Sequence, residues 1–314
     1  MHQITSTGTI GIEMKTQLIL YAPAKLNLHL DVLERRDDGF HELRSIFGMI
    51  SLYDRIEIES TAGNKCVIQG FEGIEPEKNL IWKAHQMYTR ETGMSLGCTV
   101  NCTKVIPERA GLGGGSSDCA AMLRALEIIR CAGNEEHADK QLLSSLAARL
   151  GSDVPFFLRG PVAYVEGRGD LLREISPVQE FPLILVKPDF DILTADAFRW
   201  LDTSGSRVHK SLTREDILSA YTYTGPEEWP FFNSFTPVLI DRYPQLYKLL
   251  DTLKSAGAAY CNVSGSGSSL FGIFRSEEIA KNSLITLKKM GLQVWKLKML
   301  ASLPEAVYNE NRLE

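Results

Sequence analysis

The segment that most constrains how this chain can fold is GLGGGSSD, at residues 111–118, because it places four glycines and two serines in eight positions. The sequence before it, CTVNCTKVIP, alternates in the manner of a strand. The sequence after it, CAAMLRALEIIRCAG, has apolar residues such as Ala121, Leu123, Leu126 and Ile129 at helical spacing. We therefore expect a glycine-rich turn that leads from a strand into a helix, an arrangement typical of anion-binding sites.

This turn does not match two common nucleotide-binding motifs. A dinucleotide-binding fingerprint needs a third glycine where this chain has Ser116, and a Walker A loop needs a lysine after its last glycine. What remains is a loop whose backbone amides can face phosphate oxygens at a helix N-terminus. Ser116 and Ser117 can cap that helix and offer hydroxyls to a phosphate or its magnesium ion. The alternative is a plain capped turn without a ligand.

Length, charge and cysteine content limit the class of protein. The 314 residues are enough for two domains with a buried core. The formal net charge of −5 argues against a nucleic-acid partner, and the longest apolar runs are too short to cross a membrane. The six cysteines show no paired metal-binding spacing and, without a signal peptide, are typical of a reducing cytoplasm. Residues 1–13, which precede a second methionine at Met14, are expected to be a disordered extension or a misassigned start.

The mixed order of the expected helices and strands predicts an α+β fold. A helix is expected in NLIWKAHQMYTRETG, with Asn79 as its cap and Gly93 as its end. A further helix should end at Gly151, and LILYAPAKLNLHLDVL predicts two strand pieces joined by a bend at Pro23. A domain boundary is expected near residue 175, ahead of a strand in FPLILVKP.

Three further features have ordinary structural explanations when each is taken alone. Lys25 lies inside the apolar strand segment PAKLNL, where a lysine is usually a solvated edge residue. Asp153 stands before Val-Pro in GSDVPFF, as a turn or cap residue often does. The segment VSGSGSS, residues 263–269, is a second glycine–serine turn. Only their combination in one chain indicates a site.

Together these segments resemble a known family. PAKLNLHLDVLERRDDGFHEL, PERAGLGGGSSDCAA, GSDVPFFLRGPVAYVEGRGD and VSGSGSSLFGIF are similar to the signature regions of the 4-diphosphocytidyl-2-C-methylerythritol kinases, a branch of the GHMP small-molecule kinases. The resemblance runs in order from Tyr21 to Phe274. It implies a two-domain α+β GHMP-kinase fold with the active site in the interdomain cleft. The N-terminal ATP-binding domain would span residues 14–175, and the C-terminal substrate-binding domain residues 176–314.

The resemblance also implies roles for individual residues. Lys25 and Asp153 match the catalytic pair of the family. The segment expected to bind ATP consists of Pro107, Glu108, Arg109, Ala110, Gly111, Leu112, Gly113, Gly114, Gly115, Ser116 and Ser117. The residues expected to bind the second substrate are Asn27, Phe40, His41, Phe198, Gly265, Ser266 and Gly267. In this set, the aromatic-histidine pair Phe40 and His41 would hold cytosine, and Phe198 would face the other side of the base.

The chain departs from the family pattern at a few positions. Phe40 stands where the family usually has tyrosine, so it keeps the stacking face and loses a hydroxyl. Glu108 and Arg109 precede the glycine turn where small or apolar residues are common, and Cys119 replaces an alanine. These positions concern nucleotide and base affinity rather than the reaction.

The implied reaction is ATP-dependent phosphorylation of a hydroxyl of the cytidine-diphosphate-linked methylerythritol, in the non-mevalonate isoprenoid pathway. ATP and Mg²⁺ would be required, although the sequence assigns no magnesium ligands. The expected partners are small-molecule substrates, with no nucleic acid and no membrane, and the protein is expected to be a cytoplasmic monomer or weak homodimer. Two alternatives stay open: another GHMP kinase that resembles mevalonate or homoserine kinases, and a non-catalytic small-molecule sensor on the same fold.

Overall fold

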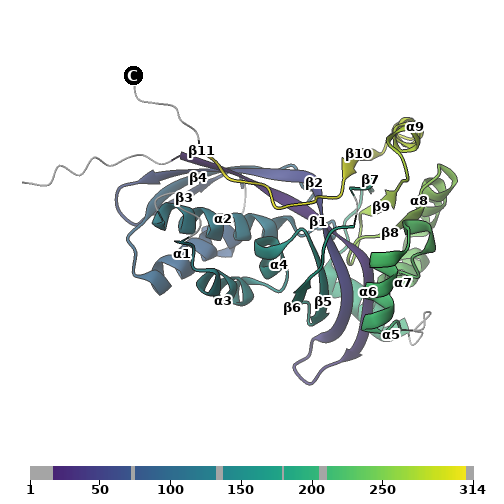
Figure 1. Ribbon diagram of the computed structural model, residues 1–314, viewed down its shortest axis with the longest axis horizontal. Coiled ribbons are helices and arrows are strands. Elements are labelled where there is room, and N and C mark those ends of the chain that lie inside the picture. Colours follow the sequence, from purple (N-terminus) through teal and green to yellow (C-terminus); the bar gives the residue numbers. More distant parts are fainter. Residues whose placement is uncertain (1–16, 72–74, 132–136, 179, 205–210, 309–314) are drawn as a thin grey trace, which may run out of the picture.

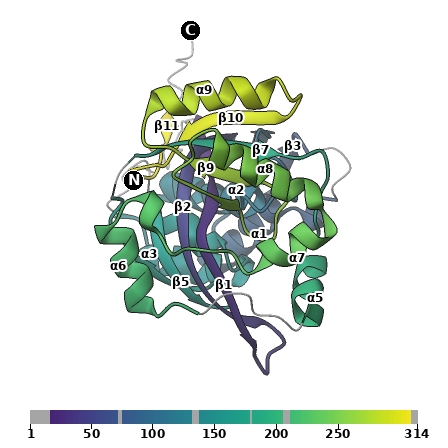
Figure 2. The same ribbon diagram turned by 90° about the vertical axis from the view of Figure 1, so that its right-hand side faces the viewer.

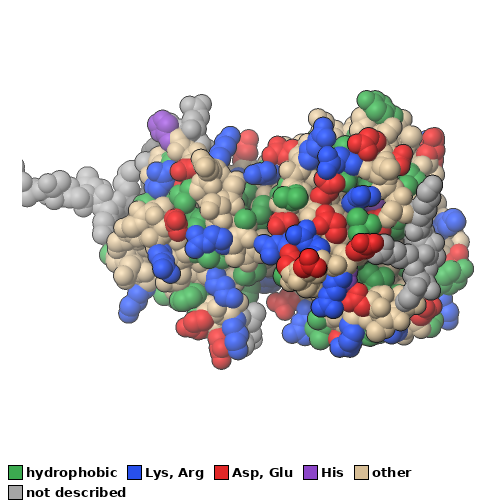
Figure 3. Space-filling model, turned by 90° about the horizontal axis from the view of Figure 1, so that it is seen from below, with side chains coloured by type: hydrophobic (Ala, Val, Ile, Leu, Met, Phe, Trp, Pro, Cys, Tyr) green, Lys and Arg blue, Asp and Glu red, His purple; other side chains and the backbone are tan. Residues whose placement is uncertain are grey.

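The computed structural model describes residues 17–71, 75–131, 137–178, 180–204 and 211–308, so the expected extension at residues 1–13 lies outside the described residues. Two β-sheets, each accompanied by helices, lie next to each other along the long axis of the molecule (Figure 1). In a space-filling view the two parts form neighbouring lobes, with acidic and basic side chains interspersed over the face shown (Figure 3).

The first sheet is seven-stranded and the second four-stranded. The first contains β1 (Gln17–Arg35), β2 (His41–Thr61), β3 (Cys66–Gln69), β4 (Gly97–Thr103), β5 (Val162–Gly167), β6 (Leu171–Glu174) and β11 (Val307–Tyr308). Its main path runs β11-β1-β2-β4-β3, and β5 pairs with both β2 and β6. The second sheet has the order β10 (Gln293–Lys298), β7 (Pro182–Lys187), β9 (Leu270–Ile273) and β8 (Tyr260–Val263).

Helices divide between the two sheets in chain order. One face of the first sheet is covered by α1 (Leu80–Thr92), α2 (Gly114–Arg130), α3 (Lys140–Leu150) and α4 (Val154–Arg159) (Figure 1). The second lobe contains α5 (Thr194–Ser204), α6 (Arg214–Tyr223), α7 (Phe235–Arg242), α8 (Pro244–Ser255) and α9 (Glu277–Lys288). Of these, α8 contacts β8 and β9, and α9 lies along β10 (Figure 2). None of the helices in the described part of the chain is long and apolar enough to cross a membrane.

Local sequence signals explain where several helices begin and end. The Asn79 side chain accepts a hydrogen bond from the amide of Ile81, and Gly93 adopts a left-handed φ of 68° that ends α1. Asp139 caps α3 in the same way, and Gly151 follows its last turn. The expected ends at Gly93 and Gly151 are therefore confirmed.

Strand β1 differs from its prediction. It is one continuous strand of 19 residues, rather than two pieces, and it pairs with β2 in an antiparallel ladder. The register shifts between Pro23 and Ala24, where a residue without a backbone N–H is tolerated as an irregularity of the ladder. A second shift lies between Asn27 and His29. The strand therefore continues through the two register shifts on either side of Lys25.

Three apolar clusters form the core of the described residues. One lies between α1–α4 and the first sheet, and another surrounds the second sheet and its helices. The third cluster contains Leu26 and Ile46 from the first sheet, Leu185 and Phe271 from the second, and Met299 after β10. Burial of this third cluster joins the two lobes, since neither sheet can cover these side chains alone.

Candidate active site

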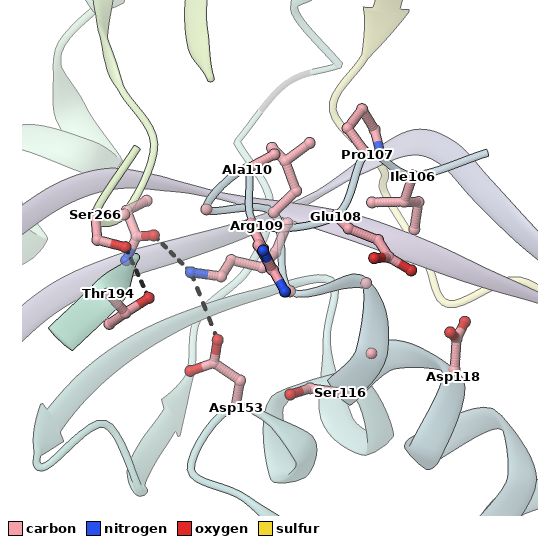
Figure 4. A pocket seen from close by; sticks show the side chains of 18 of the residues that line it. Ile106, Pro107, Glu108, Arg109, Ala110, Ser116, Asp118, Asp153, Thr194 and Ser266 are labelled. Carbon is pink, nitrogen blue, oxygen red and sulfur yellow. Dashed lines mark hydrogen bonds and ion pairs between the residues drawn. The ribbon is translucent and has the colours of Figure 1, made fainter. Parts of the chain in front are cut away.

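A cavity of about 510 Å³ is lined by residues from both lobes. Figure 4 shows Asp153, Ser116 and Asp118 along one side of it, and the segment Ile106–Ala110 along the opposite side. The predicted site residues that line the cavity are Lys25, Asn27, every residue from Pro107 to Ser116, Asp153, Phe198, Gly265 and Ser266. Segments far apart in the sequence thus meet at one place.

Four predicted site residues do not line this cavity: Phe40, His41, Ser117 and Gly267. Ser117 is buried in the first turns of α2, and its hydroxyl has no hydrogen-bond partner among the described residues. A β-carbon on Gly267 would contact Ile192 and Leu239, so Gly267 faces the core of the second lobe.

The glycine-rich turn leads from β4 toward α2, as expected. Gly113 is the N-cap of α2, with a left-handed φ of 73° and no side-chain cap. Ser116 and Ser117 lie inside the helix, so the expectation that they cap it is wrong. Glycine at this position lets the backbone turn sharply, and it leaves the first amides of α2 without a capping side chain. These amides, together with the positive end of the helix dipole, can receive an anion.

The two glycine turns are in direct contact. A β-carbon on Gly111 would lie 2.0 Å from the carbonyl oxygen of Ser264, so the backbones approach as only glycine permits. The Ser264 hydroxyl donates to the Gly111 carbonyl at 2.9 Å, and the Ser269 amide donates to Ala110 at 3.3 Å. The amide of Asn27 donates to the same Ser264 hydroxyl at 3.4 Å. The second turn therefore supports the first and connects it to β1.

Lys25 and Asp153 face each other in the cavity. The Lys25 ammonium lies 2.6 Å from Asn27 Oδ1 and 3.7 Å from Asp153 Oδ2, and dashed lines mark these contacts in Figure 4. Lys25 is only 5% exposed, and burial lowers its pKa while the Asp153 carboxylate opposes that shift. Asp153 precedes α4, and its side chain makes no capping bond, so the carboxylate stays available to the cavity.

Lys25 also connects the pair to the glycine turn. Its backbone amide donates to the Leu112 carbonyl at 2.9 Å, so β1 holds the turn directly beside the lysine side chain. The Lys25 ammonium lies 4.4 Å from the centre of the Phe47 ring, and Asn27 donates to Ser45 Oγ at 3.1 Å. These contacts position the ammonium between the turn and Asp153.

Aromatic side chains gather where α5 approaches the start of β2. The rings of His41 and Phe198 stack at 5.0 Å with an interplanar angle of 24°, and Phe198 lines the cavity. His41 Nε2 is hydrogen-bonded to Asp202 Oδ1 at 2.7 Å. Phe40 is 51% exposed, with the Arg168 guanidinium 5.3 Å from its ring centre. Sequence reasoning missed Asp202, because no local pattern connects it with His41.

A buried group of charges lies beside the glycine turn, and sequence reasoning missed it as well. The Lys104 ammonium lies 2.6 Å from Asp118 Oδ2 and also contacts Asp54. Asp118 lines the cavity, its Oδ1 finds no hydrogen-bond partner within the described part of the chain, and burial raises its pKa to about 7. Asp54 interrupts the apolar pattern of β2 with a charge, and this was the signal in the sequence that could have indicated the group. The Asp118 carboxylate and the Ser116 hydroxyl both line the cavity, and oxygen donors of this kind suit Mg²⁺.

Comparison with protein families identifies the class. The model of the GHMP kinases N terminal domain matches residues 79–161, and the model of the GHMP kinases C terminal region matches residues 226–284. A crystal structure of Methanococcus jannaschii mevalonate kinase covers 93% of this chain with a TM-score of 0.66 at 16% identity, which shows the shared fold. The predicted α+β GHMP-kinase fold is confirmed.

More similar relatives narrow the class to a family. A protein of Thermodesulfovibrio yellowstonii named 4-diphosphocytidyl-2-C-methyl-D-erythritol kinase is 35% identical over 83% of this chain and 91% of its own length. A protein of the same name from Geobacter metallireducens is 36% identical over 85% of this chain and 92% of its own length. A crystal structure of 4-(cytidine 5'-diphospho)-2C-methyl-D-erythritol kinase matches 90% of this chain and 98% of its own with a TM-score of 0.77 at 33% identity. The chain therefore belongs to the family of 4-diphosphocytidyl-2-C-methyl-D-erythritol kinases, as its sequence resemblance implied.

Proposed function

We propose that this ATP-dependent kinase transfers the γ-phosphoryl group of ATP to a hydroxyl of 4-diphosphocytidyl-2-C-methyl-D-erythritol, a step of isoprenoid precursor synthesis. The observation that supports the proposal best is the Lys25–Asp153 pair, which lies in a cavity lined by the glycine turn. The names of the relatives supply the substrate.

The chemistry follows from the positions of these groups. The substrate hydroxyl oxygen attacks the γ-phosphorus while the bond from that phosphorus to the bridging oxygen of ADP breaks. Asp153 orients the hydroxyl and accepts its proton as the oxygen–phosphorus bond forms. Lys25 lies 3.7 Å from the carboxylate and offsets the charge of the moving phosphoryl group. Asn27 holds the ammonium in place through its 2.6 Å contact.

The glycine turn is the proposed ATP-binding segment. The amides at the start of α2 would bind phosphate oxygens, since no side chain caps them. Asp118 and Ser116 would hold Mg²⁺, which when bound neutralises phosphate charge. Lys104 offsets part of the negative charge of Asp54 and Asp118 beside this position. Contact with the turn at residues 263–269 keeps the ATP-binding backbone in place.

The aromatic group is the proposed cytidine subsite. Phe198 offers a ring at the cavity, and His41 offers a polar ring edge whose orientation depends on Asp202. Phe40 is exposed at the start of β2, where its ring is accessible to a base. Stacking tolerates any base, whereas polar contacts at the base edge discriminate among bases.

The remaining sequence-based expectations accompany this proposal. We propose a division near residues 175 and 176 into an ATP-binding and a substrate-binding domain, with Gly265, Ser266 and Gly267 supporting the substrate side. We further propose that the protein acts on small molecules alone, in the cytoplasm, as a monomer or weak homodimer.

A coupled ADP-release assay with alternative alcohols tests the function. The protein should release ADP with 4-diphosphocytidyl-2-C-methyl-D-erythritol and show at least about 1000-fold lower kcat/KM with mevalonate or homoserine, because polar sites reject substrates that leave them unpaired. Phosphorus NMR of the product should show a new phosphomonoester. Faster turnover of mevalonate or homoserine would replace the proposal with another GHMP kinase activity. Binding of the cytidyl compound without turnover would indicate the sensor alternative.

A further inference from the structure

Three side chains that can bind a metal converge away from the kinase site. Cys66 on β3, His85 on α1 and Cys98 on β4 place their ligand atoms within 4.8 Å of one another. Cys66 and Cys98 are register partners on neighbouring parallel strands, and α1 packs its buried face against this edge of the sheet. The cysteine spacing in the sequence did not indicate a metal site, because the three residues come from three different elements.

The hydrogen bond of His85 to the backbone determines which ring nitrogen can bind a metal. His85 Nε2 lies 2.6 Å from the carbonyl oxygen of Leu96. A carbonyl can only accept a hydrogen bond, so Nε2 carries the proton and Nδ1 keeps its lone pair. Metal-binding histidines commonly donate their other ring N–H to a carbonyl in this way. Nδ1 lies 3.2 Å from the amide nitrogen of Gln86, an exposed side chain that can move aside.

The dimensions of the cluster suit tetrahedral Zn²⁺. Zn–S bonds of about 2.3 Å and Zn–N bonds of about 2.1 Å place the ligand atoms of a tetrahedral site roughly 3.5–3.8 Å apart. The ligand atoms of the cluster lie within 4.8 Å of one another, so they need to approach by no more than about 1 Å to reach those separations. The two cysteine β-strands and the buried helix face already hold the three residues in place.

Charge and burial select the metal. His85 and Cys98 are fully buried, and a buried site disfavours net charge. Two thiolates and one neutral imidazole balance the charge of a divalent ion. Thiolate ligands favour zinc over magnesium and calcium. We propose that Cys66, His85 and Cys98 bind Zn²⁺, with a water molecule as fourth ligand on the half-buried side of Cys66.

Zinc at this position would connect α1 to the last two strands of the sheet path. Lys78, the α1 cap Asn79 and Leu80, the first residue of α1, line the proposed nucleotide cavity. The metal would therefore stabilise the first lobe and hold one wall of that cavity, without touching a reacting group. This inference does not depend on the identity of the phosphorylated alcohol.

A metal-binding measurement on the full-length protein tests the site. Metal-free, reduced protein is titrated with Zn²⁺ against a chromophoric chelator. Wild type should bind one equivalent, and Cys66→Ser should weaken that binding by at least about 100-fold, because even changes outside the ligand set cost about 10–100-fold. Cys131→Ser removes another partly buried thiol of the same lobe and should bind as wild type does.

A second measurement needs no variant. In wild-type protein, Zn²⁺ should slow alkylation of Cys66 by iodoacetamide at least tenfold and raise the melting temperature as its concentration increases. Mg²⁺ at the same concentration should do neither. Equal Zn²⁺ binding by wild type and Cys66→Ser would overturn the proposal. So would unchanged alkylation in Zn²⁺, or a Cys66–Cys98 disulfide that persists in reductant and prevents zinc binding.

Discussion

At the scale of single residues, Lys25 connects functions that are separate in the sequence. Its amide holds the glycine turn at Leu112, while its ammonium contacts Asn27 and Asp153. A lysine in the middle of an apolar strand would be costly without these partners. The position of the glycine turn and the positive charge in the cavity therefore depend on the same residue.

Replacing Asp153 by Asn should lower kcat by about 10²–10⁴, the usual contribution of general acid–base catalysis. Asparagine preserves the shape of the side chain but cannot accept the proton. The KM for ATP should change little, because the proposed recognition of the base and the phosphates does not involve this carboxylate. Lys25→Met should also lower kcat, and the double variant should lose less than the product of the two losses. Single-turnover kinetics and calorimetry on the same preparations measure both chemistry and folding.

Asp251→Asn is the matched control, because it makes the same change at an exposed position of α8. Its kcat should equal that of wild type. A folded Asp153→Asn protein that keeps more than about a third of wild-type turnover lies far outside the general-base range and would remove Asp153 from the mechanism.

Two glycines of the turn should differ sharply in their tolerance of alanine. Gly111 has a φ of 75°, and a β-carbon there would lie 2.0 Å from the Ser264 carbonyl oxygen. Gly111→Ala should therefore cost at least about 2 kcal/mol of unfolding free energy and weaken ATP binding. A β-carbon on Gly115 meets only Leu80, at 3.8 Å, so Gly115→Ala should be neutral or stabilising within α2. Urea unfolding of the two variants measures the difference, and equal stability would contradict it.

At the scale of secondary-structure elements, Glu127 joins three helices. From α2, its carboxylate accepts hydrogen bonds from Tyr88 on α1 and from Arg130, and at 2.6 Å from the amide of Asp139, which caps α3. Glu127 is 1% exposed. Burial alone would raise its pKa, but the hydrogen bonds from Arg130, Tyr88 and Asp139 lower it to about 2.

The helix packing should therefore weaken in acid. The folded-state pKa of Glu127 lies below its ordinary value of 4.5, so its stabilisation is complete above that pH and is lost as the pH falls toward 2. Between about pH 5 and pH 3, wild type should lose on the order of 2 kcal/mol more unfolding free energy than Glu127→Gln. Glu91→Gln, which affects an exposed pair with Arg149, should follow wild type. Parallel urea curves for wild type and Glu127→Gln at both pH values would contradict the assignment.

Local patterns predicted elements well and contacts between elements poorly. Asn79 and Gly93 mark the ends of α1 because capping depends on adjacent residues. The contact of Gly111 with Ser264 has no local signal, because it depends on how two distant turns pack. Composition predicts Ser116 and Ser117 as the cap, but the left-handed backbone at Gly113 starts α2 earlier. The prediction that Lys25 and Asp153 act together comes from the family resemblance, because helical or strand periodicity does not relate two residues so far apart in the sequence; the structure places their charged groups 3.7 Å apart.

At the scale of the whole molecule, one apolar cluster joins the two lobes. Met299 is 4% exposed and packs over Gly48, where a β-carbon would lie 2.3 Å from its methyl group. The same cluster includes Leu185 and Phe271 from the second sheet. Since side chains of both sheets lose contacts together, the lobes should unfold as one cooperative unit.

Met299→Ala tests this cooperativity. Loss of the buried side chain should cost roughly 2–5 kcal/mol and shift a single calorimetric transition to lower temperature. Met290→Ala removes the same side chain at a position that is 52% exposed, and it should leave the transition unchanged. Two separate transitions, with only one of them shifted, would show that the lobes unfold independently.

The path of β1 and its pairing with β11 determine how halves of two such kinases can be combined in a chimera. β1 and β2 extend from the first sheet into contact with the second lobe, where the Leu30 amide and carbonyl bond to residues 232 and 234. β11, at the other end of the described chain, pairs with β1. In a chimera spliced only near residue 175, β1 and its contacts at residues 232 and 234 would come from different proteins, and so would the paired strands β1 and β11. Grafting a new substrate-binding half from another kinase would therefore require the donor's β1–β2 hairpin tip to be transferred with it, while the last strand stayed with the recipient.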